Sequence, residues 1–246
     1  YDLREEHGAI WLKSTGPDVG FPELNLDGFT HVDNQSYRIH APLELVLDNF
    51  TEVEHTGQVH ALLGYDPKRT HEIEVEVQPR DDHIRVINRG PQKPLPWLIQ
   101  MLFGIRNGDT FIDDWVSWFS PVYTVYDHWW QKGSSDNARP NVVRTYVFFV
   151  PENANTTRLL IFAYAKSTRW SDWSIRCLLR PILRRLLRRE VLLDISMIED
   201  LSDMDPSMKG MRLSRFDRAL GLNRDRIETI YRKSKTAPDS GTDPSP

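Results

Sequence analysis

The chain has 246 residues, and its 31 Lys and Arg against 35 Asp and Glu residues give a formal net charge of -4. This balance argues against a strongly basic nucleic-acid-binding protein. The single cysteine, Cys177, excludes an internal disulfide and any self-contained zinc or iron–sulfur site that needs several thiolates. No apolar run approaches the roughly 18 residues of a membrane-spanning helix, so no transmembrane segment is expected.

A first helix is expected to open at Pro42, a favourable first helical residue, and to run to about Leu63. Three polar residues interrupt its apolar stripe at intervals of three: Asn49, Glu52 and His55. A stripe that only buries a core does not normally carry an amide, a carboxylate and an imidazole. The pattern marks this helix face as a candidate functional site.

Two histidines of this segment, His55 and His60, are candidate metal ligands. Five residues apart, they would point about 140° away from each other on a regular helix. Joint binding of a metal therefore requires a bend or a π-type distortion, for which Gly57 offers a place. Glu52 lies between them in angle and could reach both. The chain has eight histidines, so this spacing alone is weak evidence.

Period-two alternation predicts the strands that follow. Ile73, Val75 and Val77 alternate with glutamates, and with the run that contains Ile84 and Val86 they predict a hairpin. Further strands are expected at Thr110–Trp118, Val122–Trp130, Val142–Val150 and Arg158–Lys166. Long strands in direct succession indicate an antiparallel meander.

A second long helix is expected over roughly Pro181–Met204, and Asp194 falls in the middle of its apolar stripe. An isolated buried carboxylate is costly unless it is paired, protonated or bound to a metal. Two imidazoles and one carboxylate, with coordination positions left open, form the facial triad of non-haem Fe(II) enzymes. His55, His60 and Asp194 would supply it. The competing interpretation, in which Asp194 pairs with a buried arginine, fits the pattern equally well.

The same helix carries a basic face, formed by Arg184, Arg185, Arg188 and Arg189. A solvated face on a helix packed against the sheet is the simplest interpretation. Alternatively, this basic face could contact an anionic membrane surface or an acidic electron-transfer partner. The pattern as a whole predicts the α+β class, with helices packed on one face of an antiparallel sheet. The polar segment 233–246 is expected to be a disordered tail.

Three segments carry a family resemblance. Residues 48–60, with Asp48-Asn49, Glu52, His55 and His60, resemble the iron-binding helix of the Rieske-type non-haem iron oxygenases, D-N-x-x-[D/E]-x-x-H-x-x-x-x-H. Residues 192–199 are similar to the helix segment that holds that family's third ligand. Residues 5–12 resemble the strand that ends its Rieske domain. The chain is thus identified with the branch that includes ring hydroxylases and oxidative demethylases.

The resemblance implies a role for each residue of the candidate site. His55, His60 and Asp194 are expected to bind a mononuclear Fe(II). Glu52 is expected to link this iron to a Rieske cluster, usually in the neighbouring subunit of a homotrimer, although most members carry Asp there. Asn49 is expected near the iron, where it would orient a ligand or solvent. The implied fold is a helix-grip domain, a curved antiparallel sheet around a long C-terminal helix.

The family's cluster motif, C-x-H…C-x-x-H, does not occur in the sequence. A [2Fe-2S] Rieske cluster is therefore expected either in a segment that preceded Tyr1 or in a partner protein. The resemblance divides the chain into the end of a Rieske domain (1–20), a mononuclear-iron catalytic domain (21–232) and the tail. A ferredoxin-type donor, a reductase and a cytoplasmic location are expected with it.

A bulky apolar or aromatic substrate is indicated by the many aromatic residues of the predicted strands and of the apolar segment 95–103. Candidate pocket residues are Trp97, Phe103, Trp115 and Tyr123, with plain core packing as the alternative for each. Hydroxylation, dihydroxylation and oxidative demethylation share the implied site. The rival hypothesis is a non-catalytic carrier of hydrophobic ligands on a similar fold, and a weaker one is a membrane-surface adaptor that uses the basic helix.

Overall fold

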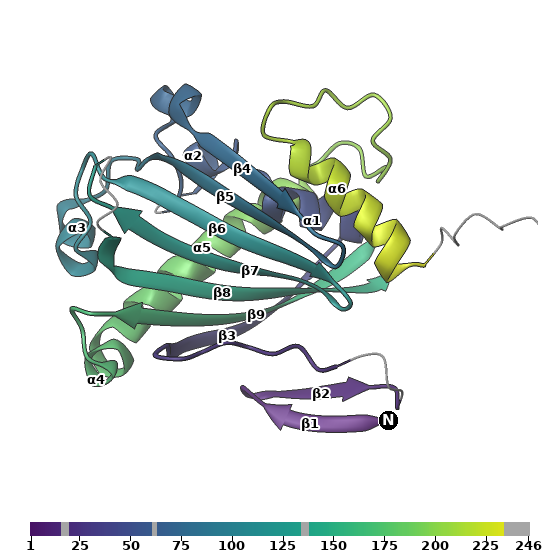
Figure 1. Cartoon of the computed structure of the whole chain (residues 1–246), viewed down its shortest axis with the longest axis horizontal. Helices are drawn as coiled ribbons and strands as arrows, with labels where there is room; N and C mark the ends of the chain where they lie inside the picture. The colour runs from purple at the N-terminus through teal and green to yellow at the C-terminus, as the bar shows by residue number, and fades with distance from the viewer. Residues whose placement is uncertain (16–19, 61–62, 134–137, 234–246) are drawn as a thin grey trace, which may run out of the picture.

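The main body of the protein is one antiparallel sheet with helices on one of its faces (Figure 1). The computed structural model describes residues 1–15, 20–60, 63–133 and 138–233. Seven strands follow the order β3-β9-β8-β7-β6-β5-β4. Their bounds are β3 Thr30–Ile39, β4 Glu74–Pro79, β5 His83–Pro91, β6 Thr110–Phe119, β7 Val122–Gln131, β8 Ala138–Asn153 and β9 Thr156–Ser167. A separate two-stranded sheet pairs β1 (Asp2–Glu6) with β2 (Ala9–Lys13).

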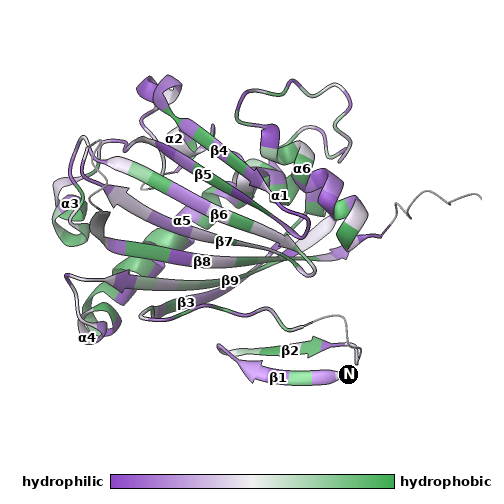
Figure 2. Ribbon diagram, in the orientation of Figure 1, coloured by the Kyte–Doolittle hydropathy of each residue, from purple (hydrophilic) through white to green (hydrophobic). Residues whose placement is uncertain are grey.

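The meander that runs from β4 to β9 confirms the strands predicted from alternation. Bands of hydrophobic and hydrophilic residues alternate along these strands (Figure 2). β3 was not predicted, because four consecutive polar residues, Asp33 to Ser36, hide its alternation. It pairs with β9 and closes the far edge of the meander, with a shift of register between His31 and Asp33.

Helices α1 (Leu43–Thr51), α5 (Arg180–Glu199) and α6 (Arg218–Arg226) lie against the inner face of the sheet (Figure 1). The other helical segments are short: α2 Thr56–Val59, η1 Pro67–Glu72, α3 Trp97–Phe103, α4 Asp172–Ser174, and the π-type turns η2 Ile175–Leu179 and η3 Ile227–Tyr231. A large apolar cluster fills the space between sheet and helices and includes Val46, Trp115, Ile161 and Ile198. The α+β class and the curved sheet around a long helix are confirmed.

The first predicted helix is shorter than expected. It ends at Thr51, because Glu52 takes an extended conformation with φ -94° and ψ 154°. The chain then makes the short helix α2. Gly57 does not supply the distortion, but it is required by a close approach, since a Cβ there would lie 2.9 Å from the carbonyl oxygen of Tyr65. The break therefore falls between the two helices, ahead of both histidines.

The long helix α5 begins one residue before the predicted start and ends at Glu199, short of Met204. Within the part of the chain that the structure describes, no helix is both long and apolar enough to cross a membrane. The β1–β2 hairpin reaches the outer face of the sheet, where the ring of Trp11 contacts Phe148 and Phe162 at 5.0 and 5.7 Å between centroids. The predicted tail lies outside the described residues, apart from Lys233.

Candidate metal centre

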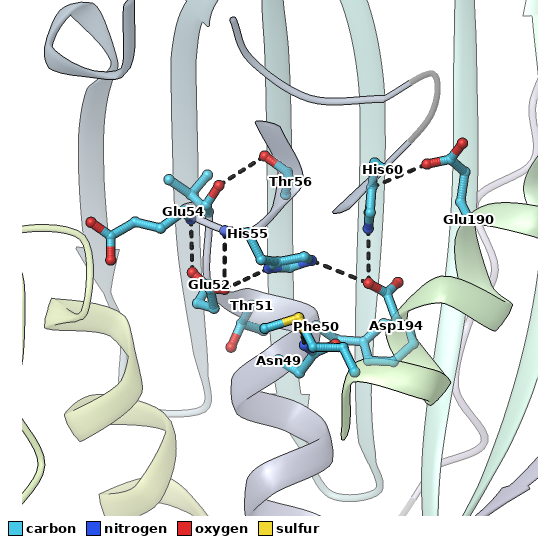
Figure 3. Close-up of polar contacts among 12 residues, drawn as sticks. Asn49, Phe50, Thr51, Glu52, Glu54, His55, Thr56, His60, Glu190 and Asp194 are labelled. Carbon is cyan, nitrogen blue, oxygen red and sulfur yellow. Dashed lines mark hydrogen bonds and ion pairs between the residues drawn. The ribbon is translucent and has the colours of Figure 1, made fainter. Parts of the chain in front are cut away.

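Two histidines and one aspartate converge from elements far apart in sequence. His55 stands at the start of α2 and His60 directly after its end, where the backbone becomes extended again with ψ 144°. Asp194 projects from α5 and is only 5% exposed. Because the chain breaks after α1 and α2 is a single short turn, the two imidazoles reach the same side of the segment (Figure 3).

Both imidazoles contact the same oxygen of Asp194. His60 Nε2 lies 2.8 Å and His55 Nε2 lies 3.1 Å from Asp194 Oδ1. The ligand atoms of all three residues lie within 4.8 Å of one another. The imidazole rings are 5.0 Å apart between centroids and inclined at 74°. Two imidazole nitrogens and one carboxylate that point at one place form a group able to hold a metal ion.

A carboxylate stands behind each imidazole (Figure 3). Glu52 Oε1 forms a hydrogen bond of 2.5 Å with His55 Nδ1. Glu190 Oε2 lies 3.4 Å from His60 Nδ1, a contact between charges without hydrogen-bond geometry, since His60 Nδ1 has no hydrogen-bond partner among the described residues. A carboxylate at Nδ1 keeps the ring proton there and leaves Nε2 free to bind a metal. Metal-binding histidines in proteins characteristically have such partners. The carboxylates around His55 and His60, as well as the three converging side chains themselves, therefore fit a metal ion.

The protonation of the metal-free cluster follows from the same contacts. Burial by itself would lower the pKa of His55, but hydrogen bonds with Asp194 and Glu52 outweigh burial and raise the pKa to about 9. For Asp194, burial acts to raise the pKa, and the hydrogen bonds with His55 and His60 bring it below its ordinary value. A proton therefore occupies a position between imidazole and carboxylate that a divalent cation can take over.

A buried lysine ties the histidine segment to the sheet. Lys93 Nζ donates hydrogen bonds to the carbonyl oxygens of His60 and of Thr56, the latter at 3.4 Å. Lys93 is 8% exposed, and burial lowers its pKa while the charge of Glu190 acts in the opposite direction. The lysine thus joins the ends of α2 to the segment that follows β5.

A cavity of about 100 Å³ adjoins the three converging residues. The helices supply the wall with His55, His60 and Asp194, and the inner face of the sheet supplies the facing wall. Sheet residues that line the cavity are Phe111, Asp113, Tyr126, His128, Thr145, Val147 and Ile161. A small, mostly apolar space beside an open metal site can hold a reactant next to the metal.

The sequence pattern of one known family covers most of this structure. The vanillate O-demethylase oxygenase C-terminal domain matches residues 39–229, which include α1, the histidine segment, the sheet from β4 onward and α5. The chain belongs to this family. The Rieske oxygenase identification made from three short segments is thereby confirmed at the level of the family. None of the curated proteins matches the chain.

Solved structures of oxygenases share the fold. Dicamba monooxygenase bound to 3,6-dichlorosalicylic acid has a TM-score of 0.75 at 14% identity, over 95% of this chain and 70% of that chain. Dicamba monooxygenase with non-heme iron and dicamba has a TM-score of 0.64 at 12% identity, over 95% and 68%. A QL mutant of NdmA from Pseudomonas putida CBB5 with caffeine has a TM-score of 0.63 at 16% identity, over 95% and 62%.

Within this oxygenase-domain fold, the predicted site residues divide into two groups. His55, His60 and Asp194 come together, and Glu52 lies directly behind His55. Asn49 lines the same cavity, but its amide donates to Met197 Sδ at 3.6 Å, and its Oδ1 has no hydrogen-bond partner among the described residues. The alternative in which Asp194 pairs with a buried arginine is not what the structure has, since its partners are the two histidines.

The predicted pocket residues lie elsewhere. Trp97 is 73% exposed on α3, and Trp115 packs inside the apolar core. Tyr123 lies in an aromatic cluster on the outer face, because it is three residues from Tyr126 and strand side chains alternate between faces. Phe103 lines a smaller adjoining cavity. None of these four residues lines the cavity that adjoins His55, His60 and Asp194.

Four residues in and around the candidate metal centre and its cavity were not predicted from the sequence: Glu190, Lys93, Asp113 and His128. For Glu190 a signal existed, because it precedes Asp194 by one helical turn and therefore shares its buried face. Asp113 and His128 occupy inward positions of predicted strands, where an apolar residue is the rule. Reading those strands for polar residues on the buried face would have found both.

Proposed function

We propose that this chain binds one Fe(II) through His55, His60 and Asp194 and is the catalytic domain of a Rieske-type oxygenase. The reaction is hydroxylation or oxidative demethylation of an apolar or aromatic substrate held in the adjoining cavity. The observation that carries the proposal is the convergence of both Nε2 atoms on one oxygen of Asp194, at the wall of that cavity. The iron in one dicamba monooxygenase structure belongs to that protein and supports the choice of metal.

The chain's own residues have separate tasks in this reaction. The bound iron would supply the activation of O₂ next to the substrate. Glu52 holds the imidazole of His55 with Nε2 toward the metal, and Glu190 places a negative charge 3.4 Å from Nδ1 of His60. The apolar cavity wall positions the substrate and excludes water, which protects the reaction from side products. Asn49 Oδ1 is placed to accept a hydrogen bond from solvent or substrate in the cavity.

Electrons come, in this proposal, from a [2Fe-2S] Rieske cluster in a preceding segment or in a partner protein, supplied in turn by a ferredoxin-type donor and a reductase. Residues 1–20 then correspond to the end of a Rieske domain and 21–232 to the catalytic domain, in a cytoplasmic homotrimer. Glu52 is the bridging residue, because its carboxylate contacts His55 on the side away from Asp194 and its side chain is 18% exposed. A carboxylate in that position can join a ligand of one centre to a ligand of another.

Iron stoichiometry tests the proposal directly. After anaerobic reconstitution with Fe(II), the native chain is expected to hold about one iron, and His55→Ala, His60→Ala and Asp194→Ala each to lose it. The electron paramagnetic resonance signal of the nitric oxide adduct checks that coordination positions remain open. His83→Ala is a matched control, because His83 forms a pair with Asp82 outside the cavity and its loss leaves the iron in place. A folded native chain without iron would contradict the proposal and favour the hydrophobic-ligand carrier.

A further inference from the structure

A row of polar side chains crosses the inner face of the sheet. Asn88 of β5 pairs in register with Asp113 of β6, which pairs in turn with His128 of β7. Paired residues on neighbouring strands project from the same face. Here that face is the one covered by helices, and Asp113 and His128 both line the cavity. Polar groups at such positions require a partner, since burial without one is costly.

The row is only partly satisfied by its own members. Asn88 Nδ2 donates to Asp113 Oδ2 at 3.1 Å, and His128 Nε2 lies 3.1 Å from Asp113 Oδ1. Among the described residues, however, Asp113 Oδ1 and His128 Nδ1 have no hydrogen-bond partner of good geometry. Asp113 Oδ1 still faces His128 Nε2, so His128 Nδ1 is the buried polar atom of the row that is left for whatever occupies the cavity.

The imidazole of His128 is held in one orientation. Its ring stacks against Phe111 at 5.7 Å and against Tyr126 at 5.9 Å between centroids, with inclinations of 19° and 18°. Tyr126 is itself fixed, because its hydroxyl donates to the carbonyl oxygen of Phe50 at 2.6 Å. Because the ring is held in this way, its Nδ1 atom presents its lone pair to a ligand in a fixed direction.

The hydrogen-bonding roles of Asp113 and His128 decide which ligand group they recognise. A carboxylate only accepts hydrogen bonds, so the ring proton of His128 is assigned to Nε2, which faces Asp113. Nδ1 is then an acceptor, as is Asp113 Oδ1. Because Asp113 Oδ1 faces the Nε2 proton, His128 Nδ1 is the acceptor that needs a hydrogen-bond donor from the ligand.

The charge of the cavity narrows the ligand further. Its described lining contains the carboxylates of Glu52, Asp113, Glu190 and Asp194 but no lysine or arginine. A bound divalent cation would balance part of this negative charge, and Lys93 acts on Glu190 from outside the lining. An additional carboxylate on the ligand would be repelled in this poorly solvated space.

We propose that Asp113 and His128 form a recognition site for an uncharged aromatic substrate that carries a hydrogen-bond donor, a phenolic O–H or a ring N–H. The site lies on the sheet side of the cavity, so the rest of the ring faces the metal ligands; this placement rests on the proposed function. Aromatic carboxylates are expected to bind more weakly, because they add a hydrogen-bond acceptor and a negative charge beside His128 Nδ1, which is an acceptor, and Asp113, which is negatively charged.

Three single-ring probes test this site by ligand-observed NMR titration: phenol, which has a donor; anisole, which lacks one; and benzoate, which is anionic. Native protein is expected to bind phenol at least about tenfold more tightly than anisole or benzoate, the size of effect given by one hydrogen bond to a buried acceptor. Benzoate binding as tightly as phenol would overturn the proposal.

Two variants locate the effect. His128→Phe keeps the stacking with Phe111 and Tyr126 but removes both nitrogens, and Asp113→Asn removes the charge. Each is expected to reduce the preference for phenol over anisole to about threefold or less, with anisole affinity unchanged. His83→Phe is the control, because His83 pairs with Asp82 outside the cavity, and it is expected to keep the native preference for phenol over anisole. If His128→Phe fails to fold by circular dichroism, Asp113→Asn decides, and an undiminished preference in a folded variant contradicts the proposal.

Iron content measured on the same samples separates this site from the proposed function. Loss of the phenol preference in variants that keep their iron supports the recognition site alone. A native chain that prefers phenol but binds no iron retains the recognition site and contradicts the oxygenase. A native chain that binds iron with no preference among the probes contradicts the recognition site and leaves the oxygenase proposal standing.

Discussion

At the scale of single residues, the candidate metal centre depends on carboxylates that are not ligands. Glu190 is 4% exposed and its carboxylate lies 3.4 Å from His60 Nδ1, so its negative charge favours a proton on Nδ1, the tautomer that leaves Nε2 free for a metal. Glu190→Gln keeps the shape and removes the charge. Fe(II) affinity is expected to fall by about tenfold, as is typical when the partner of a metal-binding histidine is changed.

Competition with a chromophoric chelator under anaerobic conditions measures this loss. Glu199→Gln is the control, because Glu199 is on the same helix, accepts a hydrogen bond from the backbone N–H of His40 and does not line the cavity. Equal iron affinity in the two variants would show that Glu190 plays no part in orienting His60.

The pH dependence of the metal-free chain follows from His55. Its pKa in the folded state is raised to about 9, from an ordinary value of 6.5, through hydrogen bonds with Asp194 and Glu52 that outweigh burial. A raised pKa stabilises the fold fully below pH 6.5, and this contribution disappears as the pH rises through 9. Between these limits the free energy of unfolding is expected to fall by on the order of 3 kcal/mol.

Urea denaturation in the presence of a chelator, from pH 6 to pH 9.5, measures the contribution of His55. The comparison is with His55→Asn, in which this part of the pH dependence is absent. Parallel curves for the native chain and the variant would contradict the assignment.

At the scale of elements, the break after α1 creates the site, and its cause is local. The carboxylate of Glu52 accepts hydrogen bonds from the backbone N–H groups of Glu54, at 2.7 Å, and of His55, at 3.2 Å. The side chain thereby replaces the helical partners of these two N–H groups, so α1 ends at Thr51. Periodicity predicted one continuous helix, because an apolar stripe does not reveal a side chain that bonds to its own backbone.

The end of α1 is also fixed from outside by α6. Arg224 donates to both oxygens of Asp48, and Asn223 donates to Thr51 Oγ1 at 3.1 Å. Both members of the Arg224–Asp48 pair are about 90% buried. Arg224→Met leaves the Asp48 carboxylate buried without its partner, so the free energy of unfolding is expected to fall by about 3 kcal/mol or more.

Urea denaturation at pH 7 measures the loss in Arg224→Met. Arg218→Met is the control, because Arg218 is an exposed residue of the same helix. A loss no greater in Arg224→Met than in Arg218→Met would show that the buried pair adds nothing to the attachment of α6.

The elements were more predictable than the contacts between them. Alternation located the strands from β4 to β9, since each has one covered face and a period-two pattern records it. Polar residues that interrupt apolar stripes drew attention to His55 and Asp194, and the family resemblance then indicated His55, His60 and Asp194 as the candidate ligands. Asp113 and His128 interrupt the inner face of the sheet in the same way, but which face of a strand is covered depends on packing partners distant in sequence.

At the scale of the whole molecule, the candidate metal centre joins the histidine segment after α1 to the long helix α5, more than 130 residues away in the chain. The two elements also share the apolar cluster beneath the sheet, where Val46 of α1 and Ile198 of α5 are both buried. Sheet, α1 and α5 thus form one body before any metal binds. The metal is expected to stabilise this body without being required for its folding.

A shift in melting temperature tests this coupling. A ligand that binds only the folded chain, at about a hundred times its dissociation constant, adds about 2.7 kcal/mol to the free energy of unfolding. For a chain of this length that corresponds to a rise of about 5–10 °C. Anaerobic scanning calorimetry with and without Fe(II) is expected to show this rise for the native chain and none for Asp194→Ala. Because the metal bridges two elements of one body, the transition should stay single in both states; a native chain without a cooperative transition until iron is added would show that α5 docks only through the metal.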